Sequence, residues 1–144
     1  MNIRKAKLND LKAIENLNNK YFQEKRDFRE IIENKNSCFL VAEEKNKIIG
    51  FSGIRVFRWN NTSQIIDIFI HPNHRGKGYA GRFINRIKAE AKKFKVRTII
   101  AEAPSLNNVL AIYIKNGFRV CGFNDRYYSN NAKEIAIFLA FDMD

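Results

Sequence analysis

The segment from Gln64 to Lys93 decides the fold of this chain. It reads QIIDIFI (Gln64–Ile70), then HPNHRGKGYAG (His71–Gly81), then RFINRIKAEAKK (Arg82–Lys93). The first part is rich in β-branched and aromatic residues, which is typical of a strand, and Pro72 ends that strand. The segment therefore predicts a strand, a glycine-rich loop and a further element in that order.

The residues after Gly78 predict an amphipathic helix. Their apolar side chains recur at intervals of three and four, which places them on one helical face. These residues are Ala80, Phe83, Ile84, Ile87, Ala91 and Phe94.

The loop between strand and helix has the composition of a phosphate site. Gly76, Gly78 and Gly81 allow sharp turns and a close approach of a ligand to the backbone. The free N–H groups at the start of the following helix add partial positive charge. Arg75 and Lys77 supply charged donors. A plain turn with solvated basic residues is the alternative, but the order of strand, arginine, glycines and amphipathic helix favours the phosphate site.

Two common nucleotide loops fit less well. The pattern Gly76-x-Gly78-x-x-Gly81, with Glu102 about 20 residues further on, satisfies the dinucleotide-binding fingerprint literally. That fingerprint turns directly off its strand, whereas His71–Arg75 intervene here, and too little chain follows Glu102 to complete such a sheet. A nucleoside triphosphate loop needs Ser or Thr after Gly-Lys, and this chain has Gly78 there.

The run Arg75–Ala80 resembles the acetyl-coenzyme A signature of the GNAT superfamily of N-acetyltransferases, Arg/Gln-x-x-Gly-x-Gly/Ala. The resemblance implies that main-chain amides of this loop hold the coenzyme pyrophosphate, and that acetyl-coenzyme A (acetyl-CoA) is the co-substrate. It implies a cofactor-binding set of Phe69, Ile70, Arg75, Gly76, Lys77, Gly78, Tyr79, Ala80, Gly81 and Asn107.

Length and composition indicate one globular domain over residues 1–144, with 45% hydrophobic and 28% charged residues. No apolar run approaches the ~20 residues of a membrane span, and the start lacks the apolar core of a signal peptide. We therefore expect a cytoplasmic protein with no membrane contact.

Cys38 and Cys121 are interpreted as small buried apolar residues. His71 and His74 lack the partners of a metal site, so no metal is expected.

The net charge of +11 favours acidic partners. Coenzyme A is itself a polyanion. The basic residues are scattered along the chain, which favours solubility over nucleic-acid binding. A basic nucleic-acid-binding module, suggested also by Trp59, Tyr127 and Tyr128, is kept as a rival although no recognised nucleic-acid motif appears. A coenzyme-binding sensor without catalysis is a second rival.

The whole chain predicts an α/β fold, a mixed sheet of six or seven strands flanked by about four helices. The strand at Thr98–Ala103 should lie parallel to Gln64–Ile70 through the crossover helix. The other expected strands are Asn2–Ala6, Ser37–Glu43, Ile48–Phe57, Phe118–Tyr128 and Glu134–Asp142, with bulges at Gly50 and Gly53. Three other helices are expected. The first begins after Asp10 as its N-cap, and the second covers Arg26–Glu33. The third runs from Asn107 or Asn108 to Asn116 and is ended by Gly117 as a left-handed residue.

Acetyl transfer to an amine requires loss of the ammonium proton, a donor to the oxygen that gains charge, and protonation of the leaving thiolate. Tyr113-x-x-x-Gly117-Phe118 resembles the family motif in which the tyrosine protonates the thiolate. An asparagine upstream, Asn107 in preference to Asn108, would hold the pantetheine or phosphate arm. The donor would be a main-chain N–H near Ile70.

Two carboxylates are candidates for the general base, and an ordered water is the alternative to both. Glu102 is the first choice because it resembles the glutamate of ribosomal-protein N-terminal acetyltransferases and of streptothricin acetyltransferases. Asp67 is the second, since burial between Ile66 and Ile68 would raise the pKa of its carboxyl group.

The tail of the chain resembles that of streptothricin acetyltransferases over Gly117–Asp125, at Tyr128 and over Glu134–Phe138. The resemblance implies an antibiotic amine as acceptor. A polyamine, a protein N-terminus and a lysine are kept as alternatives. The first third of the chain, which would line the acceptor pocket, does not decide between them. A homodimer is left open.

Overall fold

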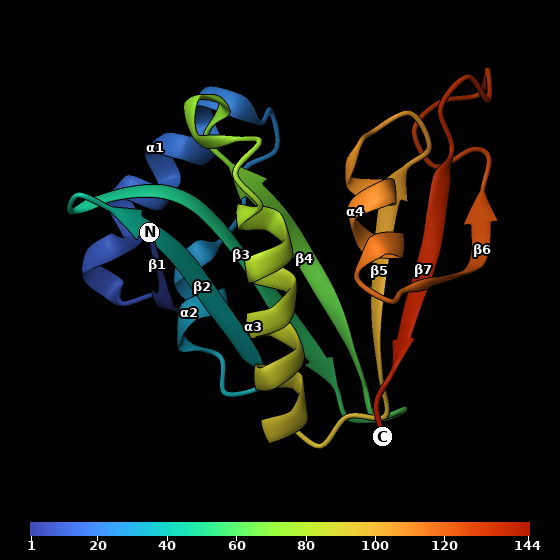
Figure 1. The fold of residues 1–144 in the computed structure, drawn as a ribbon, viewed down its shortest axis with the longest axis horizontal. Helices are drawn as coiled ribbons and strands as arrows, with labels where there is room; N and C mark the ends of the chain where they lie inside the picture. The colour runs from blue at the N-terminus through green and yellow to red at the C-terminus, as the bar shows by residue number, and fades with distance from the viewer.

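The computed structural model describes residues 1–144 and joins all seven strands in one sheet (Figure 1). The predicted mixed α/β fold is confirmed. The elements in chain order are β1 (Asn2–Lys5), a 3₁₀ turn (Leu8–Asp10), α1 (Leu11–Tyr21), α2 (Phe28–Glu33), β2 (Ser37–Glu44), β3 (Lys47–Phe57), β4 (Thr62–Ile70), a 3₁₀ turn (Pro72–His74), α3 (Tyr79–Lys93), β5 (Thr98–Pro104), α4 (Val109–Lys115), β6 (Arg119–Asn124) and β7 (Ala136–Asp142).

The strands lie in the order β1-β2-β3-β4-β5-β7-β6. Every neighbouring pair is antiparallel except β4 and β5, which are parallel as predicted. The insertion of β7 between β5 and β6 was not predicted. It follows from burial: β7 holds the buried residues Ala136, Leu139 and Ala140, whereas β6 is almost wholly exposed and suits an edge.

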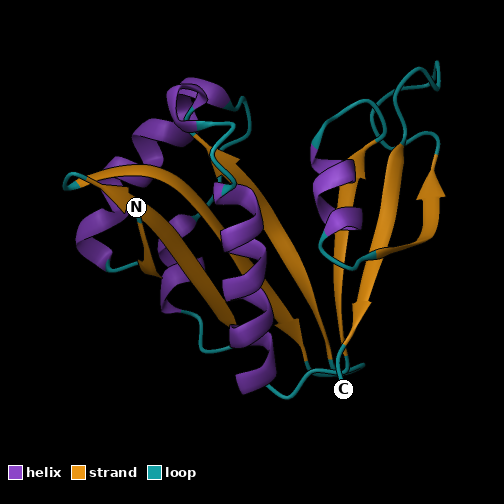
Figure 2. Ribbon diagram, in the orientation of Figure 1, coloured by secondary structure: helices purple, strands orange, loops and turns teal.

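Helices cover both faces of the sheet (Figure 2). One core packs α3 against it through Phe83, Ile84 and Ile87, and includes Tyr113 of α4. The other packs α1 and α2 through Ile14 and Phe28. Strand β2 serves both cores by alternation, with Cys38, Leu40 and Ala42 on the α3 side and Phe39 and Val41 on the other.

Strands β4 and β5 pair only at their beginnings. Their ladder joins Thr62–Gln64 to Thr98–Ile100, and beyond it the strands diverge, so that the sheet opens into a V (Figure 1). The divergence leaves the facing edges of both strands without a partner strand. Peptide groups along these edges are therefore available to a ligand.

An irregularity in the β3–β4 ladder lies at the same level as this opening. The register shifts between Ser52 and Ile54, so that Gly53 lies opposite an additional residue of β4, and the buried Ser52 hydroxyl donates to the Asp67 carbonyl. A second shift, near Gly50, lies between β2 and β3. The bulge expected near Gly50 is thus confirmed in β3, whereas the irregularity at Gly53 places its extra residue in β4. A bulge re-aims the side chains that follow it.

The N-terminal third differs from prediction at two helix starts. The helix expected over Arg26–Glu33 begins at Phe28, because the Asp27 side chain accepts from the Glu30 N–H and sets the start there. Asp10 precedes α1 but does not cap it with its side chain. Its carboxylate instead accepts two hydrogen bonds from the Arg4 guanidinium, at 2.8 and 3.0 Å.

The C-terminal hairpin is shorter than predicted. Its strands are β6 and β7, and residues 125–135 form a connection longer than the one that the predicted strands Phe118–Tyr128 and Glu134–Asp142 would leave between them. Cys121, expected to be buried, is exposed, because β6 is the edge strand of the sheet. Cys38 is buried, as predicted.

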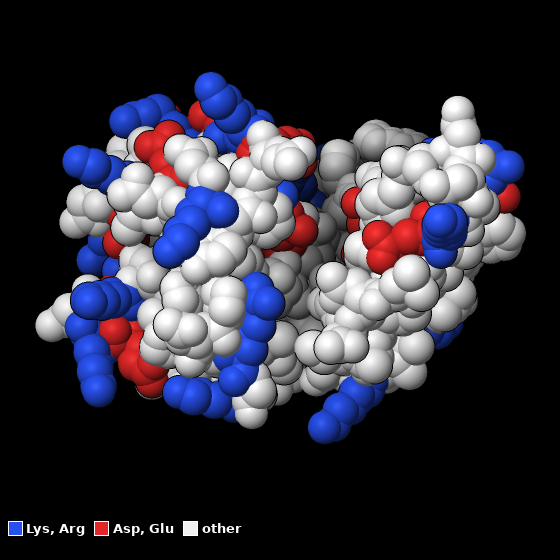
Figure 3. All heavy atoms as spheres, turned by 90° about the horizontal axis from the view of Figure 1, so that it is seen from above, with Lys and Arg blue, Asp and Glu red and all other residues white.

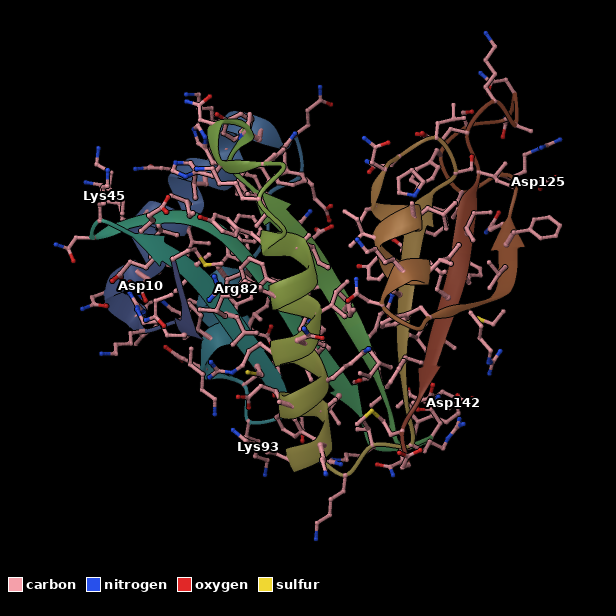
Figure 4. The ribbon with its side chains drawn as sticks, in the orientation of Figure 1. Asp10, Lys45, Arg82, Lys93, Asp125 and Asp142 are labelled. Carbon is pink, nitrogen blue, oxygen red and sulfur yellow. The ribbon has the colours of Figure 1, made fainter.

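Basic side chains are distributed over the whole molecule. Figure 4 shows Lys45 at the turn between β2 and β3 and Lys93 at the far end of α3, and Figure 3 shows blue side chains around the outline. None of the helices is both long enough and apolar enough to cross a membrane.

Candidate active site

A cavity of about 820 Å³ occupies the opening of the V, visible as a hollow between two lobes in Figure 3. Its walls are the end of β4, the loop after it, the start of α3, the end of β5, and α4. Acidic and basic side chains both lie at its rim. The divergence of β4 and β5 thus creates a cavity next to the glycine loop, where the sequence predicted a phosphate ligand.

The glycine loop forms one end of this cavity. Gly76 and Gly78 have φ of +77° and +78°, a left-handed backbone that disfavours any other residue. Helix α3 starts directly after Gly78, and no side chain caps its first N–H groups. The loop therefore presents unpaired backbone donors together with the positive end of the helix dipole.

Arg75 is held in place from two sides. Its Nε donates to the Ile70 carbonyl at 2.8 Å, and its guanidinium lies 5.8 Å from the centre of the Phe69 ring. This contact fixes the side chain against β4 and leaves its terminal nitrogens to face a ligand.

Nine of the ten residues assigned to coenzyme binding, all except Lys77, line the cavity. Lys77 is exposed and is absent from the cavity wall, although the residues on either side of it line the cavity. Gly81 lies in the first turn of α3, and a Cβ there would meet only the Asn116 side chain at an ordinary 3.7 Å. Its backbone does not demand glycine.

Tyr113 reaches the cavity from α4. Its side chain is buried against Phe118, at 5.2 Å between ring centres, and its hydroxyl group makes no hydrogen bond within the protein. Burial, and then the charges of Asp67 and Glu102, raise the pKa of the Tyr113 hydroxyl far above its usual value. The group therefore keeps its proton at neutral pH and can act as a donor.

Both asparagines at the start of α4 line the cavity. The Asn107 Oδ1 accepts from the Val109 N–H at 2.9 Å, so this side chain closes the turn that leads into α4 while its amide nitrogen remains free. At the other end of α4, Gly117 has a φ of +93° and ends the helix as predicted.

The two candidate bases differ in their partners. Asp67 forms an ion pair with Arg26, which lies in the connection between α1 and α2. Desolvation raises the pKa of the Asp67 carboxyl group, although the charge of Arg26 opposes this. Glu102 instead accepts from the Tyr127 hydroxyl at 2.9 Å, which raises the pKa of Tyr127 to about 12.

Arg26 and Tyr127 are partners of the two candidate bases, and the sequence did not reveal these pairings. Arg26 was placed in a helix, and Tyr127 was considered only as an aromatic of a nucleic-acid surface. Their partners lie 41 and 25 positions away in the chain, and no local pattern signals a pairing over such separations.

Tyr21 adds a further hydroxyl group to the cavity from the end of α1. It lies 3.2 Å from His71 Nε2, while His71 Nδ1 accepts from the Asn73 N–H at 3.1 Å. A neutral His71 must then carry its proton on Nε2 and donate it to Tyr21. His71 is thus a fixed donor in this arrangement, and the hydrogen of the Tyr21 hydroxyl is free to point into the cavity.

Comparison with known proteins agrees with this geometry. The model of the Acetyltransferase (GNAT) family matches residues 8–118. An uncharacterised N-acetyltransferase of Bacillus subtilis, YhfO, is 29% identical over 82% of this chain and 89% of its own length. Streptothricin acetyltransferase of Streptomyces lavendulae is 30% identical over 67% of this chain, but the match spans only 51% of that enzyme.

A solved structure extends the likeness. It is that of a candidate streptothricin acetyltransferase from Bacillus anthracis str. Ames in complex with acetyl coenzyme A, with 33% identity and a TM-score of 0.74. The match covers 86% of this chain and 72% of that one.

The fold and the cavity define an acyltransferase with a split parallel strand pair. The chain belongs to the GNAT acetyltransferase family, and it is an enzyme that acetylates amino groups.

Proposed function

We propose that this chain, a single cytoplasmic domain, transfers an acetyl group from acetyl-CoA to a primary amine by direct attack of the amine. One observation carries the proposal: a single cavity holds backbone donors at the glycine loop and a protonated Tyr113 on its α4 wall. The solved relative that contains acetyl coenzyme A supports the same co-substrate.

The cavity suits such a ligand in charge and size. A diphosphate would meet the uncapped start of α3, the left-handed glycines and the guanidinium of Arg75. The volume of about 820 Å³ lies within the range of ligand pockets, ~300–1,000 Å³. Acetyl-CoA, when bound, supplies an activated thioester.

The remaining chemistry belongs to the chain itself. Tyr113 would give its proton to the departing sulfur, and a main-chain N–H near Ile70, on the unpaired edge of β4, would stabilise the oxygen that gains charge, by about 3 kcal/mol. Glu102 would take the proton of the amine, directly or through a water.

Glu102 is the better base because Asp67 is held in an ion pair by the Arg26 guanidinium, whereas the partner of Glu102 is a neutral hydroxyl group, that of Tyr127. We expect Glu102→Gln to lower kcat/KM roughly tenfold to a hundredfold at neutral pH, and to recover part of this at high pH, where the amine is itself deprotonated. Asp67→Asn should cost less and should show no such recovery. The measurement is a pH profile of both variants, and the reverse ranking would transfer the role of base to Asp67.

The proposed acceptor is a small-molecule amine of the antibiotic or polyamine kind, which the likeness to streptothricin acetyltransferases favours, with a protein N-terminus or lysine as the other candidate. Screening free-thiol release against streptothricin, spermidine and peptides would separate the two classes.

Ligand-induced stabilisation tests the proposal before any acceptor is known. Acetyl-CoA should raise the melting temperature, because a ligand that binds only the native state stabilises it by RT ln(1 + [L]/Kd). Binding without thiol release from any amine would favour a sensor. Tight nucleic-acid binding at physiological salt with no response to acetyl-CoA would refute the proposal.

A further inference from the structure

Glu44, the last residue of β2, contacts both ends of the glycine loop although it lies about 30 positions earlier in the chain. Its Oε2 lies 2.8 Å from His74 Nδ1, and its Oε1 accepts from the Tyr79 hydroxyl at 3.1 Å. His74 immediately precedes the segment Arg75–Gly78, and Tyr79 immediately follows it. One carboxylate therefore spans the entire loop.

The loop has little else to define its shape. A Cβ added at Gly76 or Gly78 would meet no atom within 4 Å, so neither glycine is packed against a neighbour. Glycine also has the largest conformational freedom to lose on ordering. Arg75 contacts Ile70, Phe69 and the Pro72 carbonyl, and the Gly78 carbonyl accepts from the Arg82 N–H. Between Arg75 and Gly78, the shape of the segment depends on how its two ends are held.

Glu44 is itself rigidly placed. It pairs with Lys47 across the two-residue turn between β2 and β3, in which Lys45 and Asn46 have φ of 51° and 62°. Two consecutive left-handed residues are the mark of a tight hairpin turn. Figure 4 labels Lys45 at this turn. The carboxylate thus projects from the end of a hairpin anchored in the sheet.

Glu44 is a negatively charged residue beside a loop that we assign to an anion. A carboxylate beside an anion site repels the anion, so its presence is not explained by attraction of the ligand. His74 Nδ1 lies against this carboxylate as a close polar contact, which becomes an ion pair when the imidazole is protonated. Desolvation raises the pKa of Glu44, but the bonds from Tyr79 and His74 outweigh it and hold that pKa below its usual value.

We propose that Glu44 is a positioning residue that fastens both ends of the glycine loop and thereby raises the affinity for the coenzyme diphosphate. The inference rests on the proposed function, since it takes the loop as the diphosphate site. Glu44 touches neither substrate nor reacting atoms in this role.

The test compares Glu44→Ala and Glu44→Gln with Glu33→Ala, an exposed glutamate of α2 far from the loop. Calorimetry with coenzyme A should give about tenfold weaker binding for Glu44→Ala, the loss expected when one hydrogen bond, from Tyr79, and one close polar contact, with His74, are removed together. Glu44→Gln can still accept from Tyr79 and should fall between. The KM for acetyl-CoA should rise while kcat at saturation stays within twofold, a split that general destabilisation would not produce.

Trypsin supplies a readout without ligand, because it cleaves after Arg75 and Lys77, inside the loop. In the ligand-free protein Glu44→Ala should speed cleavage at these two bonds severalfold, and Glu33→Ala should not. Unchanged coenzyme affinity in Glu44→Ala, with a wild type that binds, would overturn the inference. If the wild type itself fails to bind coenzyme A, the proposed function fails, and the cleavage rates alone decide whether Glu44 fastens the loop.

Discussion

Replacing Tyr113 by phenylalanine should lower kcat at least a hundredfold while leaving the affinity for coenzyme A within twofold of the wild type. The substitution removes one oxygen from the cavity wall and leaves the ring against Phe118. General acid catalysis by a positioned side chain typically contributes ~10²–10⁴-fold. The buried hydroxyl is the proton donor that we assign to the departing sulfur.

The same variant should fold normally. The Tyr113 hydroxyl makes no hydrogen bond within the protein, so its removal leaves no buried partner unsatisfied. We expect the melting temperature to change by no more than a few degrees, which separates loss of chemistry from loss of structure. Tyr128→Phe, on the exposed connection before β7, is the matched control and should retain full turnover.

The pH profile offers a second check on Tyr113. Because its pKa is raised, the protonated form persists as the pH increases, and no activity should be lost through its ionisation below about pH 10. Wild-type turnover in Tyr113→Phe would remove this residue from the chemistry.

Local signals account for what the sequence could predict. The strand before the loop, the crossover helix and the glycine turns follow from short patterns: an apolar strand, a period of three and four, and glycine where the backbone must turn. Gly117 was predicted in the same way. Each of these features depends on residues within one or two turns of one another, so the chain itself displays the cause.

The features that the sequence could not predict depend on pairing between residues far apart in the chain. Arg26 meets Asp67, Tyr127 meets Glu102, and Glu44 reaches the glycine loop only after the sheet has formed. The position of β7 between β5 and β6 could not be predicted from local patterns either, because it depends on comparing the burial of two strands.

Lys77 illustrates a further limit. Its charge and position in the loop resembled those of a phosphate ligand, yet its side chain is exposed and lies outside the cavity wall. Sequence identifies the loop but not which of its side chains face inward.

Reversing the charge at this loop should have the largest effect on binding. Arg75→Glu should weaken coenzyme A more than a hundredfold and abolish the rise in melting temperature. A hydrogen bond to a charged group contributes ~1.5–3 kcal/mol, and the introduced carboxylate adds repulsion of the diphosphate. The variant also loses the Nε contact with the Ile70 carbonyl, which frees the loop from β4. Together these exceed about 2.8 kcal/mol, the equivalent of a hundredfold.

Two further reversals show whether the effect is local. Lys35→Glu and Lys77→Glu change the net charge by the same amount as Arg75→Glu, but Lys35 is exposed far from the cavity and Lys77 lies outside its wall. Lys35→Glu should bind coenzyme A normally. Lys77→Glu should lose several-fold through unscreened repulsion, and that loss should shrink as salt is added. Equal losses of coenzyme A affinity in all three variants would mean that the overall charge attracts the coenzyme, and not the Arg75 guanidinium beside the N-terminus of α3.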